Sequence, residues 1–194
     1  GILAKRNDEK HKKDIEANNL ELIDLVVVNL YPFKKTVDQG AEWEDAIENI
    51  DIGGPSMIRS AAKNHKDVPV LVDPSQYQNF LEESKKGELK ESYKTKLALE
   101  AFQHTADYDT AISNWIRKER GLQSSKYIES YPLIKTLRYG ENPHQKAFWY
   151  GLNNIGWNSA EQLQGKELSY NNLLDLESAL STVLEFGYTE KDEL

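Results

Sequence analysis

The sequence predicts an α/β protein with parallel strands, and three observations lead to this prediction. Residues 23–28 and residues 68–72 are short, β-branched and almost continuously apolar, as strands buried on both faces of a parallel sheet are. Helical segments separate the two runs, and a long helical region follows the second. We therefore expect the two runs to be neighbouring parallel strands in one sheet, with helices on both of its faces.

The spacing of polar and apolar residues predicts three helices before the second strand. A polar, fraying helix is expected over residues 8–18. Residues 41–50 carry apolar side chains at helical spacing. Another helix is expected from residue 55 to about residue 64, and Pro55 suits its first position. The DIGGP segment at residues 51–55 separates these two helices.

The second strand is followed by a long helical region and then by a change of composition. The helical region runs from about residue 76 to residue 117, with a break at residues 85–87. Residues 121–132 are polar and rich in serine, which indicates a linker or a domain boundary. We therefore expect a first domain over residues 1–130 and a second domain that begins at residue 131.

The second part is predicted to hold a strand at residues 147–150 and a helix from about residue 172 to residue 186. Gly187 is the expected C-terminal stop of that helix. Its expected buried stripe consists of Leu173, Leu176, Leu180 and Val183. Residues 132–194 look too short for a complete second domain.

The composition excludes several classes of function. The chain has 194 residues and a formal net charge of −8, with 39% hydrophobic and 29% charged residues, which is typical of a soluble globular protein. It has no cysteine, which excludes disulfides, thiolate zinc sites and cysteine nucleophiles. The acidic balance argues against bulk nucleic-acid or membrane binding. No apolar run reaches the length of a membrane span. The four histidines show no metal-ligand spacing. A cytoplasmic setting is expected.

Two segments of the first part carry residues that suit ligand chemistry. Asp51 precedes two glycines, where the backbone can approach a ligand and leave free N–H groups pointing at it. An ordinary turn with Asp51 as a helix cap is the alternative. Lys63 lies beside two alanines, and a partly desolvated lysine can act as a base. An exposed cation at a helix C-terminus is the alternative there.

Polar and aromatic residues also follow the first predicted strand. Ligands of parallel α/β sheets bind beyond the carboxyl ends of the strands, so Asn29 could read an amide or purine edge and Tyr31 could hydrogen-bond or stack. A turn closed by an aromatic side chain is the alternative. In the second part, Arg138 could bind a phosphate bidentately or lie in a surface loop.

Five segments with distinctive residues occur in order along the chain. They are NLYPF at residues 29–33, DIGG at 51–54, AAKNH at 61–65, FQHTADYD at 102–109 and LRYGENPHQ at 137–145. Together they closely resemble the bifunctional purine-biosynthesis enzymes that are both AICAR formyltransferase and IMP cyclohydrolase. LQGKELSYNN at residues 163–172 is similar to the bacterial form of that family. The resemblance covers essentially the whole chain.

The resemblance implies a fold and two reactions. The first domain would have the methylglyoxal-synthase-like fold, which is Rossmann-like, and would close formyl-AICAR to IMP with loss of water. Residues 131–194 would open an α/β transformylase domain, which passes a formyl group from the co-substrate 10-formyltetrahydrofolate to AICAR. The implied partners are AICAR, formyl-AICAR, IMP and folate, in a homodimer with no covalently bound cofactor, no metal, no nucleic acid and no membrane.

The resemblance also implies roles for particular residues. Lys63 matches the family's proposed proton donor and acceptor, and Asp51 and Tyr31 match active-site residues. The matches to substrate-binding residues are Val28, Asn29, Ile52 and Gly53 in the first domain and Arg138 and Tyr139, which bind AICAR, in the second.

The chain departs from the family at both ends. The family begins with a strand and a phosphate-binding loop, followed by a loop with a catalytic lysine, and all of these precede the position of Gly1. Most folate-binding residues and a Lys-His pair lie beyond the position of Leu194. We therefore expect an internal piece that is inactive alone. A non-catalytic nucleotide-binding regulatory module of the same fold is the alternative, although such a module has no reason to carry residues 138–145.

Overall fold

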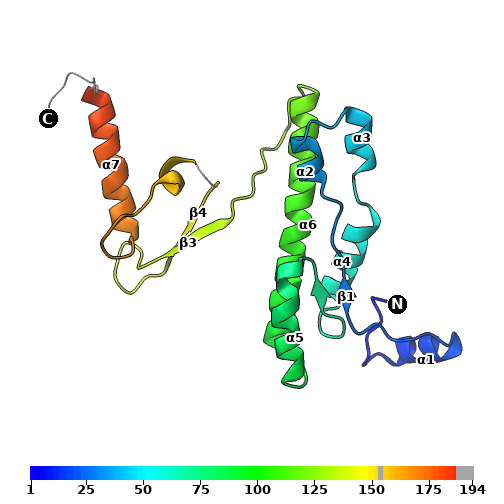
Figure 1. The fold of residues 1–194 in the computed structure, drawn as a ribbon. Helices are drawn as coiled ribbons and strands as arrows, with labels where there is room; N and C mark the ends of the chain where they lie inside the picture. Colours follow the sequence, from blue (N-terminus) through cyan, green and yellow to red (C-terminus); the bar gives the residue numbers. More distant parts are fainter. Residues whose placement is uncertain (153–154, 187–194) are drawn as a thin grey trace. The chain divides into compact units, whose positions relative to one another are not determined.

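The computed structural model describes residues 1–152 and 155–186, which form two compact units (Figure 1). The first unit is Gly1–Glu129 and the second is Ser130–Leu194. The division falls inside the polar segment at residues 121–132. No helix of the described ranges is long and apolar enough to cross a membrane.

The first unit is built on two parallel strands, as the sequence predicts. β1 (Val26–Val27) pairs with β2 (Val70–Leu71), with Val26 opposite Val70 and Val27 opposite Leu71. The Val28 N–H extends the ladder by donating to the Leu71 carbonyl at 3.0 Å. The neighbouring parallel arrangement is therefore confirmed, although both strands are shorter than the apolar runs that predict them.

One face of this small sheet packs against two helices. α4 (Gly53–Lys63) and α6 (Glu91–Glu119) contact each other and the strands. The buried core cluster consists of Val26, Ile58, Ala61, Ala62, Val68, Val70, Val72, Ala98 and Ala101. Val27 points to the opposite face and is 47% exposed, so the expected burial of the first strand on both faces is wrong. Both residues of β2 are buried.

The other predicted helices of the first unit are all present. α1 (Glu9–Ala17), α3 (Trp43–Glu48) and α5 (Tyr77–Lys85) lie inside the predicted helical ranges, and the break before α6 is also confirmed. Two short elements were not predicted, namely α2 (Phe33–Asp38) and the 3₁₀ turn η1 (Pro74–Gln76). α2 buries Phe33 almost completely, against Tyr108 and Trp115 of α6.

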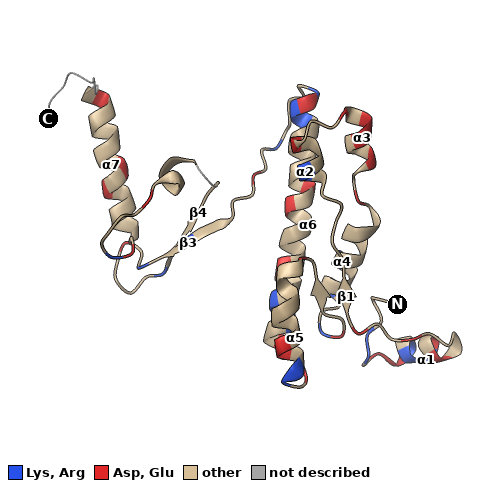
Figure 2. Cartoon of the chain, viewed as in Figure 1, with Lys and Arg blue, Asp and Glu red and all other residues tan. Residues whose placement is uncertain are grey.

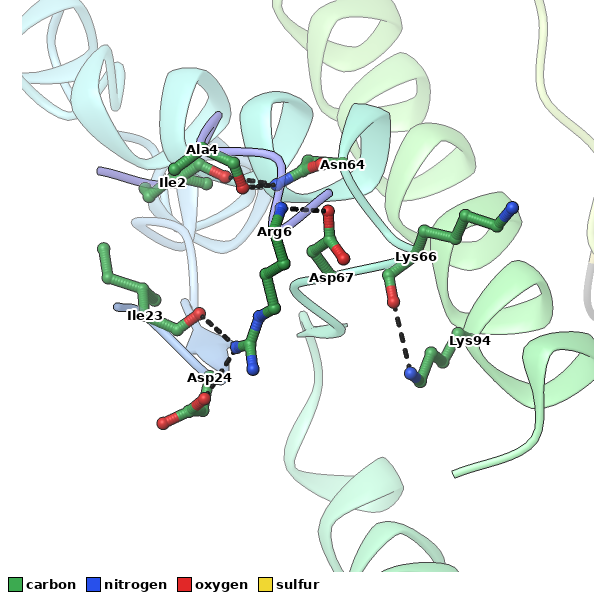
Figure 3. A network of polar contacts seen from close by, with 9 residues as sticks. All are labelled: Ile2, Ala4, Arg6, Ile23, Asp24, Asn64, Lys66, Asp67 and Lys94. Atoms are coloured by element: carbon green, nitrogen blue, oxygen red, sulfur yellow. Dashed lines mark hydrogen bonds and ion pairs between the residues drawn. The ribbon is translucent and has the colours of Figure 1, made fainter. Parts of the chain in front are cut away.

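The N-terminal segment is fastened to the C-terminal end of α4, as Figure 3 shows. The side-chain amide of Asn64, which is 6% exposed, donates to the carbonyls of Ile2 and Ala4, both at 2.9 Å. The Arg6 N–H donates to Asp67, and the Arg6 guanidinium pairs with Asp24 at 2.6 Å. These contacts hold the segment at the amino edge of the sheet.

The second unit consists of a hairpin and a helix. β3 (Leu133–Leu137) pairs antiparallel with β4 (Ala147–Tyr150), and η2 (Gly156–Ser159) and α7 (Tyr170–Phe186) follow. β4 and α7 match the predicted strand and helix, whereas β3 was not predicted. The predicted stop at Gly187 lies outside the described residues.

The apolar stripe of α7 is not buried, contrary to expectation. Leu176, Leu180 and Val183 are 36%, 42% and 44% exposed, and Leu173 is half-buried. Figure 2 shows α7 as mostly uncharged, with a few acidic positions. The helical spacing therefore predicted the helix correctly, but within the described part of this unit no element covers the stripe.

Candidate functional site

A hollow of about 660 Å³ lies at the carboxyl ends of both parallel strands. Its walls come from residues 29–33 after β1, from residues 72–74 after β2, and from α2 and α6. This edge is where open parallel sheets bind ligands, because the strand-end loops converge there.

Asn29 and Tyr31 both line this hollow, as expected from their position after the first strand. The Asn29 side-chain amide donates to the Tyr77 hydroxyl at 3.2 Å. Tyr31 is 57% exposed, so its ring is available to a bound molecule. Val28, the preceding residue, is half-buried and packs against the core cluster.

Asp51 lies beside the hollow and joins the end of β1 to the start of α4. Its Oδ1 accepts from the Gly54 N–H at 2.7 Å, and its Oδ2 accepts from the Tyr31 N–H at 3.3 Å. The structural alternative for Asp51, a helix cap, therefore has direct support. Each carboxylate oxygen still has a lone pair for a ligand donor, so the cap does not exclude a binding role.

The two glycines after Asp51 differ in their surroundings. A Cβ on Gly54 would lie 2.6 Å from Asp51 Oδ2 and 2.6 Å from Leu30 Cδ2, whereas nothing lies within 4 Å of the corresponding position on Gly53. Gly54 therefore permits the close approach of the Asp51 carboxylate. Its N–H is already bonded to that carboxylate, and so it is not one of the free N–H groups that the sequence suggested. Ile52 is 75% exposed.

Lys63 lies at the opposite end of α4 from this cluster. The ends of α4 are about 15 Å apart along the axis, at a rise of about 1.5 Å per residue. Lys63 is exposed, and its side chain has no hydrogen bond or ion pair with another described residue. The structure thus brings together Asn29, Tyr31 and Asp51 but not Lys63, whose surroundings fit the alternative of a helix-end cation.

Two residues of α6 at the hollow, His104 and Tyr108, were not predicted as site residues from the sequence. The Tyr108 hydroxyl accepts from the Asp51 N–H at 2.8 Å and donates to the Asn49 carbonyl at 3.3 Å, and burial raises the pKa of Tyr108. His104, one turn earlier, also lines the hollow, and its buried Nε2 has no partner among the described residues. Their spacing of four within FQHTADYD was the available signal, because it places both on one helix face.

Arg138 and Tyr139 lie in the second unit and contact each other. The Arg138 guanidinium lies 4.8 Å from the centre of the Tyr139 ring, and its Nη2 donates to the Tyr139 hydroxyl at 3.4 Å. The Arg138 N–H donates to the Leu168 carbonyl, and the Tyr139 carbonyl accepts from the Tyr170 N–H. Arg138 also lines a separate hollow of about 1000 Å³, together with Trp149, Trp157, Lys166 and other residues of this unit.

No group of three or more histidine, aspartate or glutamate side chains that could hold a metal ion occurs in residues 1–152 and 155–186.

Two family models match the chain, one after the other. The model of the methylglyoxal-synthase-like (MGS-like) domain matches residues 2–56, and the model of the AICARFT/IMPCHase bienzyme matches residues 61–192. The chain belongs to the AICARFT/IMPCHase bienzyme family. The α/β fold class and the methylglyoxal-synthase-like character of the first unit are thereby confirmed.

Curated relatives in this family match the chain from end to end. It is 94% identical over 194 residues to the "Bifunctional purine biosynthesis protein PurH" of Prochlorococcus marinus strain MIT 9301, and 92% identical to the protein of the same name from strain CCMP1986 / NIES-2087 / MED4. The chain spans 38% of the length of each. A solved structure, described as the crystal structure of ForH, is 30% identical, with a TM-score of 0.48 over 58% of this chain and 59% of that one.

Proposed function

We propose that the chain is a segment of a bifunctional enzyme of purine synthesis. One site of that enzyme closes formyl-AICAR to IMP with loss of water, and the other moves a formyl group from 10-formyltetrahydrofolate to AICAR. The observation that carries this proposal is the 94% identity over the whole chain to a protein named for bifunctional purine biosynthesis.

The first unit contributes to the ring-closing site, with the nucleotide in the strand-end hollow. Asn29 and Tyr31 line that hollow and contact the purine precursor, with support from Val28 behind them. The Asp51 carboxylate accepts from the carboxamide N–H of formyl-AICAR, and Ile52 and Gly53 lie against the same group. This placement uses the lone pairs of Asp51 that the protein's own N–H groups leave free.

Ring closure moves two protons onto the formyl oxygen, one from the attacking carboxamide nitrogen and one from the formamide nitrogen, which forms a C=N double bond to the former formyl carbon as the oxygen leaves. The carboxamide nitrogen bonds to the formyl carbon, and the former formyl oxygen leaves as water. Asp51 orients the carboxamide nitrogen, and Lys63 acts as the general acid and base that transfers protons in this step. Only the match of Lys63 to the family motif supports this role, because about 15 Å of helix separates it from the start of α4.

The second unit contributes to the formyl-transfer site. The Arg138 guanidinium supplies a fork of N–H donors for a phosphate or for a planar acceptor of AICAR. Tyr139 positions the guanidinium through its ring and its hydroxyl. The division between Glu129 and Ser130 supports assigning residues 1–130 to the cyclohydrolase and residues 131–194 to the opening of the transformylase.

The rest of the proposal concerns the whole enzyme. It takes AICAR, formyl-AICAR and IMP as nucleotides and 10-formyltetrahydrofolate as co-substrate, with no covalently bound cofactor. It works in the cytoplasm as a homodimer, without nucleic-acid or membrane partners. A purely regulatory module leaves the bienzyme match through residues 61–192 unexplained.

A chimera tests the proposal. The matching segment of the PurH protein from strain MIT 9301 is replaced by these 194 residues, and both reactions are assayed beside the unaltered relative. We expect both rates within a few-fold of the relative, together with growth of a purine-requiring host. A folded chimera that binds IMP but catalyses neither reaction would support the regulatory alternative and contradict the proposal.

A further inference from the structure

We propose that Tyr108 is a positioning residue that sets Asp51 for ring closure. This inference rests on the proposed function, and it adds a residue of α6 to the proposed catalytic and binding residues of the first unit, which come from the end of β1, from Asp51 and from α4. Tyr108 acts through Asp51 and does not itself take part in the chemistry.

The Tyr108 hydroxyl holds the backbone on both sides of Ile50. It accepts from the Asp51 N–H at 2.8 Å and donates to the Asn49 carbonyl at 3.3 Å. A neutral phenol is needed for both bonds, since only the protonated group can donate. Burial raises the pKa of Tyr108, which keeps the hydroxyl protonated.

Asp51 is consequently fixed from three elements. Its N–H is held by α6, its Oδ1 by the Gly54 N–H of α4, and its Oδ2 by the Tyr31 N–H after β1. The partners of the two carboxylate oxygens are backbone N–H groups of Gly54 and Tyr31, which a change of the Gly54 or Tyr31 side chain leaves in place. The contact from Tyr108 is made by a side-chain atom, and so it can be removed while Asp51 itself is retained.

The ring of Tyr108 has packing that does not depend on its hydroxyl. It lies edge-on to Phe33 at 6.3 Å between centroids, and Phe33 is almost fully buried. Tyr108→Phe should therefore keep the ring in place and leave the Asn49–Asp51 backbone without its partner. The Asp51 carboxylate would then shift relative to the hollow, and small misplacements of catalytic groups cost up to about 100-fold in rate.

The same helix offers a matched control. The Tyr93 hydroxyl accepts from the Asn79 side-chain amide at 3.3 Å, and burial raises the pKa of Tyr93 as well. Tyr93 does not line the hollow. Tyr93→Phe thus removes the hydroxyl of a partly buried tyrosine of α6 and leaves the hydrogen bonds of Asp51 in place.

The test is carried out in the chimera, at a temperature well below the melting temperature of each variant. We expect Tyr108→Phe to lower kcat for ring closure by about 10- to 100-fold, with KM for formyl-AICAR changed by less than about 3-fold. Tyr93→Phe should keep the kcat of the unsubstituted chimera. An undiminished kcat in Tyr108→Phe, or equal losses in the two variants, would overturn the assignment.

A double-mutant cycle separates positioning from general loosening of the fold. If Tyr108 acts through Asp51, Tyr108→Phe should change kcat by less than about 3-fold in an Asp51→Ala background. A full 10- to 100-fold loss in that background would show an independent structural effect and refute the inference. If the unsubstituted chimera closes no ring, the proposed function is wrong, and the assignment of Tyr108 is wrong with it. If the chimera is active but the losses of kcat from Tyr108→Phe and Asp51→Ala are additive, only the assignment of Tyr108 is wrong.

Discussion

At the scale of single residues, Asp51 combines two roles. Its carboxylate caps the start of α4 through the Gly54 N–H and ties the Tyr31 N–H to the same point. The sequence predicted both the cap and the ligand contact as alternatives, and the geometry allows both at once. The contact between Tyr108 and Asp51 could not be predicted from the sequence, because the two residues are 57 positions apart and helical spacing shows only which face of its helix Tyr108 occupies.

Replacing Asp51 should affect stability and activity together. Asp51→Ala removes the acceptor for two backbone N–H groups, which should cost about 1–2 kcal/mol of unfolding free energy. It should also weaken IMP binding and slow ring closure, measured in the chimera by calorimetry and by kcat/KM. If the melting temperature falls while binding and kcat/KM stay unchanged, Asp51 is a cap alone.

Lys63 gives the sharpest test of the residue roles taken from the family. Lys63→Met should keep the fold and IMP binding but lower ring closure by about 100-fold or more, which is the usual scale for a positioned acid or base. Lys66→Met is the control, because Lys66 is an exposed lysine three positions further on, at 3.7 Å from Glu91. Full turnover in Lys63→Met would identify Lys63 as a helix-end cation.

At the scale of elements, local patterns predicted the helices and the parallel pairing well, but not the burial. The run at residues 23–28 indicated a strand covered on both faces, yet Val27 is 47% exposed, because coverage depends on which helices pack on each face. α2 was missed since Pro32 indicated only the end of a strand. The apolar stripe of α7 predicted a helix correctly, but periodicity does not say what covers a stripe.

The first turn of α4 provides a test at this scale. Gly54→Ala places a methyl group 2.6 Å from Asp51 Oδ2 and Leu30 Cδ2, so we expect a loss of about 1–3 kcal/mol in unfolding free energy. Gly53→Ala meets no atom within 4 Å and should be neutral or slightly stabilising. Both are read from denaturant unfolding of the chimera. Equal changes in unfolding free energy for the two substitutions would contradict the close approach of the Asp51 and Leu30 side chains to Gly54.

At the scale of the whole molecule, the two units carry separate candidate sites. The strand-end hollow is lined by residues between Asn29 and Tyr108, and the larger hollow by residues between Ile134 and Ala179. The polar composition of residues 121–132 indicated a boundary, and the structure divides inside that segment. The division leads to the central claim that the two units serve different reactions.

Arg138 should therefore matter for one reaction only. Removal of a charge-assisted hydrogen bond costs about 1.5–3 kcal/mol, which corresponds to roughly 10- to 150-fold in binding. Arg138→Ala should depress formyl transfer to AICAR by about that factor, with ring closure of supplied formyl-AICAR nearly unchanged. A thermal melt of the variant provides the control for folding.

The most direct measurement is to assay both reactions on Arg138→Ala and on Asp51→Ala in the same chimera. We expect opposite patterns: Arg138→Ala loses formyl transfer and keeps ring closure, whereas Asp51→Ala loses ring closure and keeps formyl transfer. Equal losses of both reactions in either folded variant would mean a shared site or a common structural role, and would contradict the assignment of the two reactions to separate units.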